Sequence, residues 1–339
     1  MVRACIIGFG GIAQGHRAAY ANLEKQGIAK LVGAYDIDPE QFTRKITINI
    51  DTGEREKVDI HFYTDLEEML AKEQPDVIDI CLPSFLHADF AVEMLERGYH
   101  VQCEKPMALN YADCKRMLAA AEKSGKQLMI GQILHFFWEY DYLKKAIDDG
   151  RFGKVLAASF SRLSSPPRWA WENWFMCPER SGGAMTDLHI HDVDMVRYLF
   201  GEPKAVACQA QGFVSGKDDT CFTNFYYDSK IPIHATGDWN LWGVDFKASF
   251  RVTFEKAVVV MEGSGITVYP SDYSGPWKPE NTDPIGFDAE IGYFAGVVEG
   301  KYENTKNPAW SAAKSIKLVE AMRKSAAEGG IVVPFDAED

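Results

Sequence analysis

Hydrophobic positions in the first third of the chain form short runs separated by stretches with helical spacing. Runs of this kind are typical of buried parallel strands with helices between them. The expected strands are 2–7, 31–35, 77–82, 99–102 and 128–130, and the expected helices are 11–26, 87–97 and 110–123. Strands that alternate with helices predict a parallel, doubly wound α/β sheet. A charged stretch at 49–59 is expected to be a solvated insertion before the third strand.

The pattern changes beyond residue 130, where strand-like runs follow one another with few helices between them. These runs are 155–162, 205–213, 222–227, 233–240, 246–254, 258–262 and 266–269. Such a succession predicts an α+β domain built on one mostly antiparallel open sheet. A helical tail is expected at 310–327, before two glycines. Because one core seldom grows to the full 339 residues, we expect two domains, 1–130 and 131–339.

The first apolar run leads directly into a glycine-rich turn of the GxGxxA type. The turn consists of Gly8, Phe9, Gly10, Gly11, Ile12 and Ala13. Glycine is needed where the backbone turns sharply and approaches a pyrophosphate, and the next helix presents unpaired N–H groups to phosphate. A strand before the turn and a helix after it favour an N-terminal Rossmann dinucleotide-binding domain over a tight turn without a ligand.

The second strand ends at Asp36, which indicates the type of dinucleotide. A carboxylate there accepts hydrogen bonds from both ribose hydroxyls. A 2′-phosphate about 4 Å away would be repelled by roughly 4 kcal/mol at an effective dielectric of about 20. Ile37 follows, with no Arg or Lys beside it to receive a phosphate. NAD is therefore favoured over NADP. Asp38 and Pro39 are expected to be the N-cap and first-turn proline of the next helix.

Composition narrows the class of protein. The net charge of −13 argues against binding to nucleic acid or anionic membranes, because phosphate contacts need a positive field. No run approaches 18 apolar residues and the N-terminus lacks a signal-peptide pattern, so a cytoplasmic location is expected. Seven cysteines without a CxxC pair indicate buried reduced thiols rather than a disulfide framework or a zinc site.

Two loops follow strands at the expected carboxyl edge of the parallel sheet, where ligands of such sheets bind. One runs from Pro83 to His87, and the other contains Glu104, Lys105 and Pro106. Lys105 is either a cation that stabilises a reacting oxygen or a surface lysine paired with Glu104. His87 either contacts a nicotinamide or packs at the start of a helix.

A second cluster of polar residues lies between 181 and 194. On a continuous helix Asp187, His191 and Asp194 share one face, whereas His189 falls on the apolar stripe and is expected in the core. No metal is expected, because His189 and His191 can chelate one only if this stretch is extended. An aspartate four residues before a histidine can hold the imidazole as a proton acceptor, or the pair can be structural.

With these motifs in this order, the sequence resembles the glucose-fructose oxidoreductase, inositol dehydrogenase and MocA family of NAD(P)-dependent oxidoreductases. The resemblance spans nearly the whole chain and also includes Pro83, His87, Leu109, Asn110, Trp174, Phe175, Gly182, Gly183, Asp194, Leu199, Phe200 and Gly201. It implies a Rossmann domain followed by an open sheet whose exposed face mediates homodimers or homotetramers. It also implies that Lys105, Asp187 and His191 are the catalytic groups.

Three positions depart from the family pattern. His189 stands where glycine is frequent, His135 where an arginine or asparagine is frequent, and Trp138 where a proline is frequent. The pocket therefore differs from that of a standard inositol dehydrogenase. Because of these departures the identity of the substrate is not predicted, whereas the expected hydride transfer is unaffected.

We expect reversible hydride transfer between NAD and a secondary hydroxyl carbon of a sugar, a polyol or a related small molecule. His191 is expected to be the general base, Lys105 the donor to the developing alkoxide, and Asp187 the residue that orients substrate or imidazole. The expected substrate residues are these three and Trp174. The aromatic stretch with Arg168, Trp169, Trp171, Trp174 and Phe175 either stacks on a sugar or packs in a loop. The expected cofactor residues are Gly8, Phe9, Gly10, Gly11, Ile12, Asp36, Pro83, His87, Glu104 and Lys105.

Two other functions remain open. One is a glycosidase that uses bound NAD transiently with no net redox change, which release of NADH during turnover distinguishes from a dehydrogenase. The other is a non-enzymatic NAD-binding sensor. Retention of Lys105, Asp187 and His191 argues against the sensor, because a sensor needs none of the three.

Overall fold

The computed structural model describes residues 1–43, 60–280 and 286–338. It divides into two compact units. The first consists of Met1–Phe136, Arg168–Trp174 and Pro284–Ala313, and the second of Phe137–Pro167, Phe175–Asp283 and Lys314–Asp339. The expected boundary after residue 130 lies close to the first change of unit, while the segments at 168 and 284 return to the first unit. The expected insertion at 49–59 lies outside the described residues.

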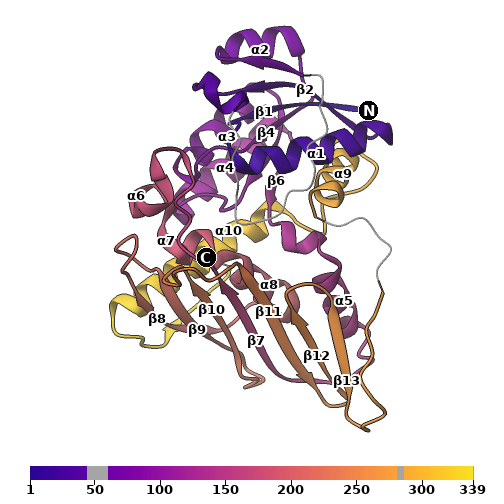
Figure 1. The fold of residues 1–339 in the computed structure, drawn as a ribbon, viewed down its shortest axis with the longest axis vertical. Helices are drawn as coiled ribbons and strands as arrows, with labels where there is room; N and C mark the ends of the chain where they lie inside the picture. Colours follow the sequence, from indigo (N-terminus) through magenta and orange to yellow (C-terminus); the bar gives the residue numbers. More distant parts are fainter. Residues whose placement is uncertain (44–59, 281–285, 339) are drawn as a thin grey trace. The chain divides into compact units, whose positions relative to one another are not determined.

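The first unit contains a six-stranded sheet in the order β3-β2-β1-β4-β5-β6 (Figure 1). Its strands are β1 (Val2–Ile7), β2 (Ala29–Tyr35), β3 (His61–Tyr63), β4 (Val77–Ile80), β5 (His100–Glu104) and β6 (Leu128–Gly131). All neighbouring strands pair in parallel, which confirms the predicted doubly wound sheet. The observed bounds lie within about two residues of the predicted ones.

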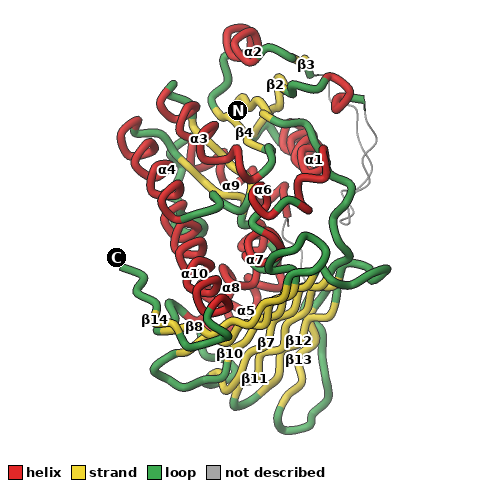
Figure 2. Tube along the Cα trace, turned by 90° about the vertical axis from the view of Figure 1, so that its left-hand side faces the viewer, coloured by secondary structure: helices red, strands yellow, loops and turns green. Residues whose placement is uncertain are grey.

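Helices cover both faces of this sheet. They are α1 (Gly11–Lys25), α2 (Leu66–Glu73), α3 (His87–Glu96), α4 (Tyr111–Ser124) and α9 (Gly286–Val298), with short 3-10 helices η1 (Pro39–Phe42), η2 (Ser84–Leu86) and η3 (Ile133–Phe136). Figure 2 shows α3 and α4 on one side of the strands and α1 on the other. Helix α9, which the sequence pattern did not predict, packs against α1. Asp38 caps η1 by accepting a hydrogen bond from Glu40 N, as predicted.

Burial on both faces explains why the central strands are almost uniformly apolar. Every residue of β4 is buried, and β1 is buried except at Arg3. Parallel strands between two layers of helices read as continuous Val, Ile and Leu runs for this reason. Asp79 is the polar exception in β4, and its side chain is completely buried. A buried carboxyl at the centre of a sheet needs a polar partner, which makes Asp79 informative about the site described below.

The second unit contains an eight-stranded sheet in the order β13-β12-β11-β7-β10-β9-β8-β14. Its strands are β7 (Val155–Leu163), β8 (Ala205–Gln211), β9 (Thr220–Tyr226), β10 (Ile233–Asp238), β11 (Lys247–Phe254), β12 (Ala257–Glu262), β13 (Ile266–Pro270) and β14 (Val333–Pro334). Strands β7 and β10 pair in parallel and the other neighbours are antiparallel. The predicted mostly antiparallel sheet is confirmed.

One face of this second sheet is buried and the other is open. Along β9, buried residues alternate with exposed ones, including Phe222 and Tyr226. The helices of this part of the chain are α5 (Trp138–Asp148), α6 (Pro178–Ser181), α7 (Gly183–Asp187), α8 (Ile190–Phe200) and α10 (Ala309–Ala327), with the 3-10 helix η4 (Trp171–Met176) just before α6. Helices α5, α8 and α10 lie on the same side of the sheet in Figure 2. The alternation therefore follows from helices that cover one face only.

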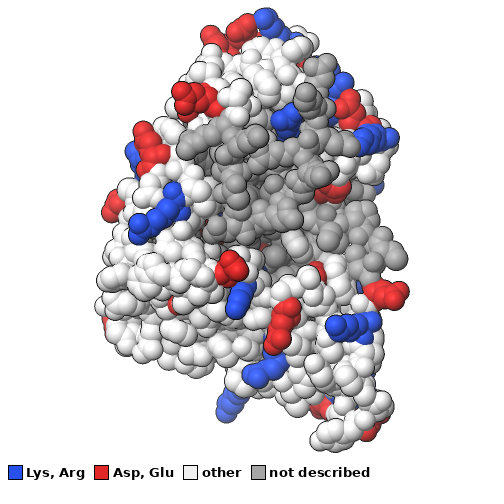
Figure 3. Space-filling view, in the orientation of Figure 1, with Lys and Arg blue, Asp and Glu red and all other residues white. Residues whose placement is uncertain are grey.

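The seven cysteines form no disulfide with one another in the described structure, and six of them are buried. No helix within the described residues is long and apolar enough to cross a membrane. On the described part of the face in Figure 3, Lys and Arg lie scattered among Asp and Glu, and they form no continuous basic patch there.

Candidate functional site

The turn between β1 and α1 has the geometry of a phosphate-binding loop. Gly8 has a φ of +89°, and a Cβ at this position would lie 2.9 Å from Cys81 O and from Leu82 Cδ2. Only glycine fits there. Gly10 is the N-cap of α1, with no side-chain cap, and among the described residues other than its chain neighbours no heavy atom lies within 4 Å of where its Cβ would be. The first N–H groups of this 15-residue helix thus have no side-chain cap, as a helix start that receives a phosphate requires.

Asp36 is fixed beside this turn by backbone hydrogen bonds. Its Oδ2 accepts from Phe9 N at 2.7 Å and its Oδ1 from Asp38 N at 2.9 Å. Burial raises the pKa of Asp36 above its usual value, and the two backbone hydrogen bonds oppose that effect. The Phe9 ring is buried against Phe42 and Phe62, so Phe9 serves the turn through its backbone. A glycine turn, an uncapped helix start and a nearby carboxylate together fit a dinucleotide with a free ribose diol.

The other expected cofactor residues lie in the same unit. Gly11 is buried and Ile12 half-buried on the first turn of α1, and Pro83 is the half-buried N-cap of η2. The structure brings Gly8 next to the loop after β4 through its contact with Cys81 and Leu82. This is the carboxyl edge of the sheet, where dinucleotides bind to doubly wound folds.

His87 holds two loops of this edge together. Its Nδ1 lies 2.7 Å from Pro106 O and its Nε2 2.8 Å from Leu82 O. Burial lowers the pKa of His87, and its contacts with the two carbonyl oxygens oppose that effect. His87 therefore has the packing role that the sequence left open. Contact between His87 and a cofactor stays a prediction.

Lys105 follows β5 at the same edge and is half-buried. The carboxylate of Glu104 is turned inward: its Oε2 accepts from Lys105 N at 3.2 Å, and its Oε1 lies 2.9 Å from His16 Nε2. Glu104 thus contacts both the backbone that carries Lys105 and the interior of the sheet.

The sequence interpretation missed the residue at the centre of this arrangement, His16 on α1. Its ring is completely buried and touches Asp79 as well as Glu104. Two signals were present in the sequence: a histidine five residues after Gly11 on a helix that must pack against the sheet, and an aspartate inside an apolar strand. His16, Asp79 and Cys81 also lie close enough together to offer ligand atoms to one metal ion.

Asp187 and His191 belong to the second unit, but not to the continuous helix that was predicted. Helix α7 ends at Asp187 and α8 begins at Ile190. His189 N donates to Ala184 O at 2.8 Å, one residue further back than in an α-helix, so the turn widens between the two helices. The prediction of one straight helical face is therefore wrong. Asp187 is buried and His191 is half-buried.

Other members of this cluster have structural partners. Asp194 accepts a hydrogen bond from Ser315 Oγ of α10 at 2.6 Å and lies 3.8 Å from Arg197 Nη1. Arg323, also on α10, donates to Gly182 O at 2.6 Å, just before the segment with Asp187. Helix α10 therefore contacts both the start of α7 and the middle of α8, a long-range arrangement that local spacing did not indicate.

His189 lies in the core, as predicted, and a glycine makes room for it. The ring is completely buried, and its Nε2 lies 3.0 Å from Thr223 Oγ1. Burial lowers the pKa of His189 to about 3, and the charge of Arg162 acts in the same direction. A Cβ at position 237 would lie 2.7 Å from His189 Cβ, so Gly237 is required beside this histidine.

The aromatic stretch crosses from one unit to the other. Trp174 is largely buried and belongs to the first unit. Phe175 belongs to the second, where its ring packs edge-on against Trp239 with centroids 6.0 Å apart. For Phe175 the packing alternative is thus realised, while sugar contact by Trp174 stays a prediction.

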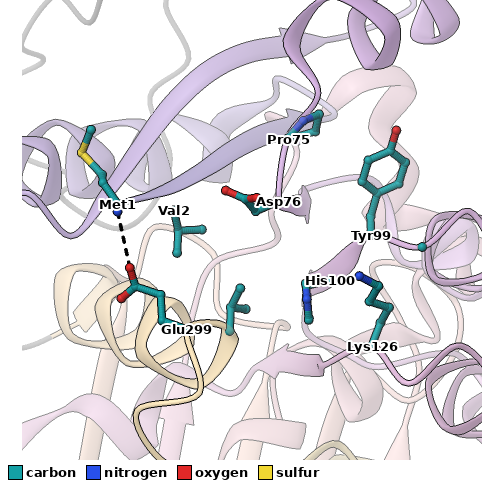
Figure 4. A pocket seen from close by; sticks show the side chains of 10 residues that line it. Met1, Val2, Pro75, Asp76, Tyr99, His100, Lys126 and Glu299 are labelled. Atoms are coloured by element: carbon teal, nitrogen blue, oxygen red, sulfur yellow. Dashed lines mark ion pairs between the residues drawn. The ribbon is translucent and has the colours of Figure 1, made fainter.

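A pocket of about 360 Å³ lies at the opposite edge of the first sheet. Figure 4 shows Asp76, His100 and Lys126 around it, with Met1 N paired to Glu299. It lies beside Val2 and His100, the first residues of β1 and β5, and hence at the amino ends of the strands. Ligands of doubly wound sheets bind at the carboxyl ends, so this pocket is not the expected cofactor site.

Comparisons with known proteins agree with these features. The family model described as "Oxidoreductase family, NAD-binding Rossmann fold" matches residues 2–132, and the model of the GFO/IDH/MocA C-terminal domain matches residues 140–260. Together they cover well over half of the chain.

Two curated relatives illustrate the range of the family. A 2,7-anhydro-N-acetylneuraminate hydratase of Mediterraneibacter gnavus is 33% identical over 196 residues, which are 55% of this chain and 52% of the hydratase. The chain thus matches about half the length of that relative. The scyllo-inositol 2-dehydrogenase (NADP(+)) IolU of Bacillus subtilis is 26% identical, covering 81% of this chain and 84% of the relative.

Solved structures share the fold along almost the whole chain. The WlbA dehydrogenase of Bordetella pertussis, in complex with NADH and UDP-GlcNAcA, has a TM-score of 0.79 at 24% identity and covers 99% of each chain. A levoglucosan dehydrogenase in complex with NADH has a TM-score of 0.81 at 20% identity and covers 99% of this chain and 100% of its own. The chain belongs to the GFO/IDH/MocA family of oxidoreductases and carries its NAD-binding Rossmann fold.

Proposed function

We propose that this protein is an NAD-dependent oxidoreductase that acts on a secondary hydroxyl carbon of a sugar, a polyol or a related small molecule. The observation that carries the proposal is the carboxyl edge of the first sheet. There the Gly8 turn, the uncapped start of α1 and the Asp36 carboxylate form a dinucleotide site, and Lys105 follows β5 at the same edge. Relatives named as inositol dehydrogenases support the substrate class.

Each residue has a distinct role in this proposal. Backbone N–H groups at Gly10 and Gly11 bind the pyrophosphate, and Asp36 accepts hydrogen bonds from the ribose hydroxyls. Bound NAD supplies the acceptor for the hydrogen and two electrons that leave the substrate carbon. His191 accepts the hydroxyl proton at a ring nitrogen, and Lys105 donates a hydrogen bond to the oxygen as negative charge develops on it.

Asp187 orients His191 or the substrate in this proposal, and Trp174 covers an apolar face of the sugar. The short α7 helix with Asp187 is held by Arg323, which limits the orientations open to that carboxylate. Preorganisation of this kind lowers the cost of ordering the reacting groups.

The test is NADH formation at 340 nm with sugars, inositols and sugar acids. On a substrate identified in this way, His191→Asn is expected to lower kcat by about 10²- to 10⁴-fold, the usual contribution of a general base. His234→Asn is a matched control, because His234 lies on the open face of the second sheet, where its Nε2 contacts Ser159 Oγ. Full turnover by His191→Asn contradicts the base assignment.

A second candidate is an NAD-assisted reaction with no net redox change. It is favoured by two relatives named as hydratases, which are 33% and 32% identical, since addition of water requires no net oxidation. Product formation that requires NAD but accumulates no NADH supports this candidate, whereas stoichiometric NADH supports the dehydrogenase.

A non-enzymatic sensor is the third alternative. Tight NAD binding without product from any compound of the panel favours it.

A further inference from the structure

Five titratable side chains from separate elements meet in the interior of the first unit. They are His16 of α1, Asp79 of β4, Cys81 just after it, Glu104 of β5 and Glu290 of α9. All five are buried, three of them completely. Such a cluster in an apolar core is costly unless its charges are paired, so its arrangement requires an explanation beyond packing.

His16 bridges two carboxylates of this cluster. Its Nδ1 lies 2.8 Å from Asp79 Oδ2, and its Nε2 lies 2.9 Å from Glu104 Oε1. A carboxylate only accepts hydrogen bonds, so each ring nitrogen must donate, and a ring that donates at both nitrogens is an imidazolium. Burial alone would lower the pKa of His16, but Asp79 and the Cys81 thiol outweigh it and hold this pKa well above 6.5.

Glu290 of α9 is the fifth member of the cluster. Neither of its carboxyl oxygens has a hydrogen-bond partner among the described residues. Burial raises the pKa of Glu290 well above its usual value, and the charge of Glu104 raises it further. Burial therefore favours the neutral form of Glu290, and the imidazolium of His16 is shared between Asp79 and Glu104.

Glu104 connects this cluster to the candidate site. One of its oxygens, Oε1, faces His16, while the other, Oε2, accepts the backbone N–H of Lys105 at 3.2 Å. Because both oxygens belong to one planar carboxylate, a rotation that breaks the first contact also misaligns the second. The orientation of the peptide that carries Lys105 thus depends on a hydrogen bond from α1.

We propose that His16 is a positioning residue for Lys105: its hydrogen bond to Glu104 Oε1 orients the carboxylate whose Oε2 holds the Lys105 N–H. Only the effect on turnover rests on the proposed function, because the contact itself needs neither substrate nor cofactor. His16 acts through Glu104 and touches no reacting atom.

Two substitutions separate positioning from simple support of the core. The amide nitrogen of His16→Gln reaches the place of Nε2 and keeps a donor for Glu104. The amide nitrogen of His16→Asn reaches only the place of Nδ1 and keeps a donor for Asp79. Each variant loses the imidazolium charge and leaves one buried carboxylate without its donor. Their melting temperatures are therefore expected to fall by similar amounts.

The readout is hydrogen–deuterium exchange of the Lys105 amide, measured on the full chain without ligand. His16→Asn is expected to speed this exchange at least tenfold over the wild type, and His16→Gln to leave it within about threefold. His61→Gln is the matched control, since His61 Nδ1 pairs with Glu73 at 2.7 Å in the same unit but lies largely exposed. This control is expected to change neither exchange nor turnover.

Turnover provides the second readout. On an identified substrate, His16→Asn is expected to have a kcat at least tenfold below that of His16→Gln, with a similar KM for NAD, because neither variant alters the Gly8 turn or Asp36. Equal exchange in the two variants, or exchange that follows melting temperature alone, overturns the positioning role. If exchange separates the variants while the wild type produces no NADH with any compound, the proposed function fails and the positioning role stands.

Discussion

Each unit of this protein buries one histidine completely, and the two rings have opposite acid–base properties. His16 and His189 are both fully inaccessible to solvent. The pKa of His16 lies well above 6.5, although burial alone would lower it, because Asp79 and Cys81 together outweigh burial. The pKa of His189 falls to about 3 through burial, with the charge of Arg162 adding to the effect. Burial is common to both rings, so the neighbours determine the charge.

The two sheets explain why the neighbours differ. In the first unit, adjacent parallel strands each direct an acid, Asp79 or Glu104, toward the same residue of α1. In the second unit, Asp192 is paired with Arg162, whose Nε lies 3.0 Å from Asp192 Oδ2, and His189 Nε2 lies 3.0 Å from the Thr223 hydroxyl. The contrast between His16 and His189 therefore depends on whether the nearby acid contacts the ring or is already paired with an arginine.

The largest expected effect comes from making the same substitution at both histidines. His16→Leu leaves Asp79 and Glu104 buried without their cation, and breaking a buried ion pair costs about 3–5 kcal/mol. His189→Leu removes a neutral ring with one hydrogen bond, for which about 1–2 kcal/mol is expected. Urea unfolding measures both differences. Equal losses contradict the contrast between the two sites.

The pH dependence of stability is expected to have opposite signs for the two residues. Between pH 6.5 and about 3, His189 binds a proton only in the unfolded chain, so stability falls as pH falls, by up to about 1.4 kcal/mol per pH unit. Above pH 6.5, folded His16 retains a proton that the unfolded chain has lost, so its contribution falls as pH rises.

Thermal melts from pH 4 to pH 9 check both slopes. His189→Leu is expected to lessen the acid slope and leave the alkaline slope unchanged. If His189→Leu keeps the acid slope of the wild type, then groups other than His189 cause that slope.

A smaller effect is expected where His189 meets the sheet. Gly237→Ala places a methyl group 2.7 Å from His189 Cβ, and overpacking of this kind costs about 1–3 kcal/mol. His189→Gly removes the atom it meets, so the double variant is expected to lose less than the sum of the single variants. A double-mutant cycle measures this coupling. If the losses of the two single variants add up exactly, then β10 moves aside to accept the methyl group and the two residues are not coupled.

The smallest effect on stability is expected at the open face of the second sheet. Helices cover both faces of the first sheet but only one face of the second, where Phe222 and Tyr226 are exposed on β9. The family resemblance implies subunit contact through this face. Phe222→Lys is expected to shift the protein to a smaller species in light scattering without lowering its melting temperature. Tyr273→Lys, at another exposed aromatic residue, is the control.

Local pattern was enough to predict most elements of both sheets. Strands β4 and β9 show why, since the first is a continuous apolar run and the second alternates buried and exposed residues. Each pattern follows from the number of covered faces. Helix α9 was not predicted. It lies far along the chain from the first sheet, and local sequence does not indicate which distant element a segment packs against.

The candidate site was only partly accessible from the sequence. Gly8 and Asp36 were recognised because their roles depend on local turn geometry and on the end of a strand. The break at Leu188 was not recognised, because it accompanies a contact of the His189 ring with Thr223, a residue 34 positions further along the chain. A helical wheel assumes a regular backbone and has no means of detecting such a turn.

By itself, the sequence determined the two kinds of sheet, the glycine turn, the acid beside it and the order of the family motifs, since each depends on residues close together in the chain. Tertiary structure alone decided which buried histidine carries a proton and how Glu104 is oriented. Those properties depend on partners from β4, β5 and β7, and a charge in a core is governed by whatever the fold brings within hydrogen-bond distance of it.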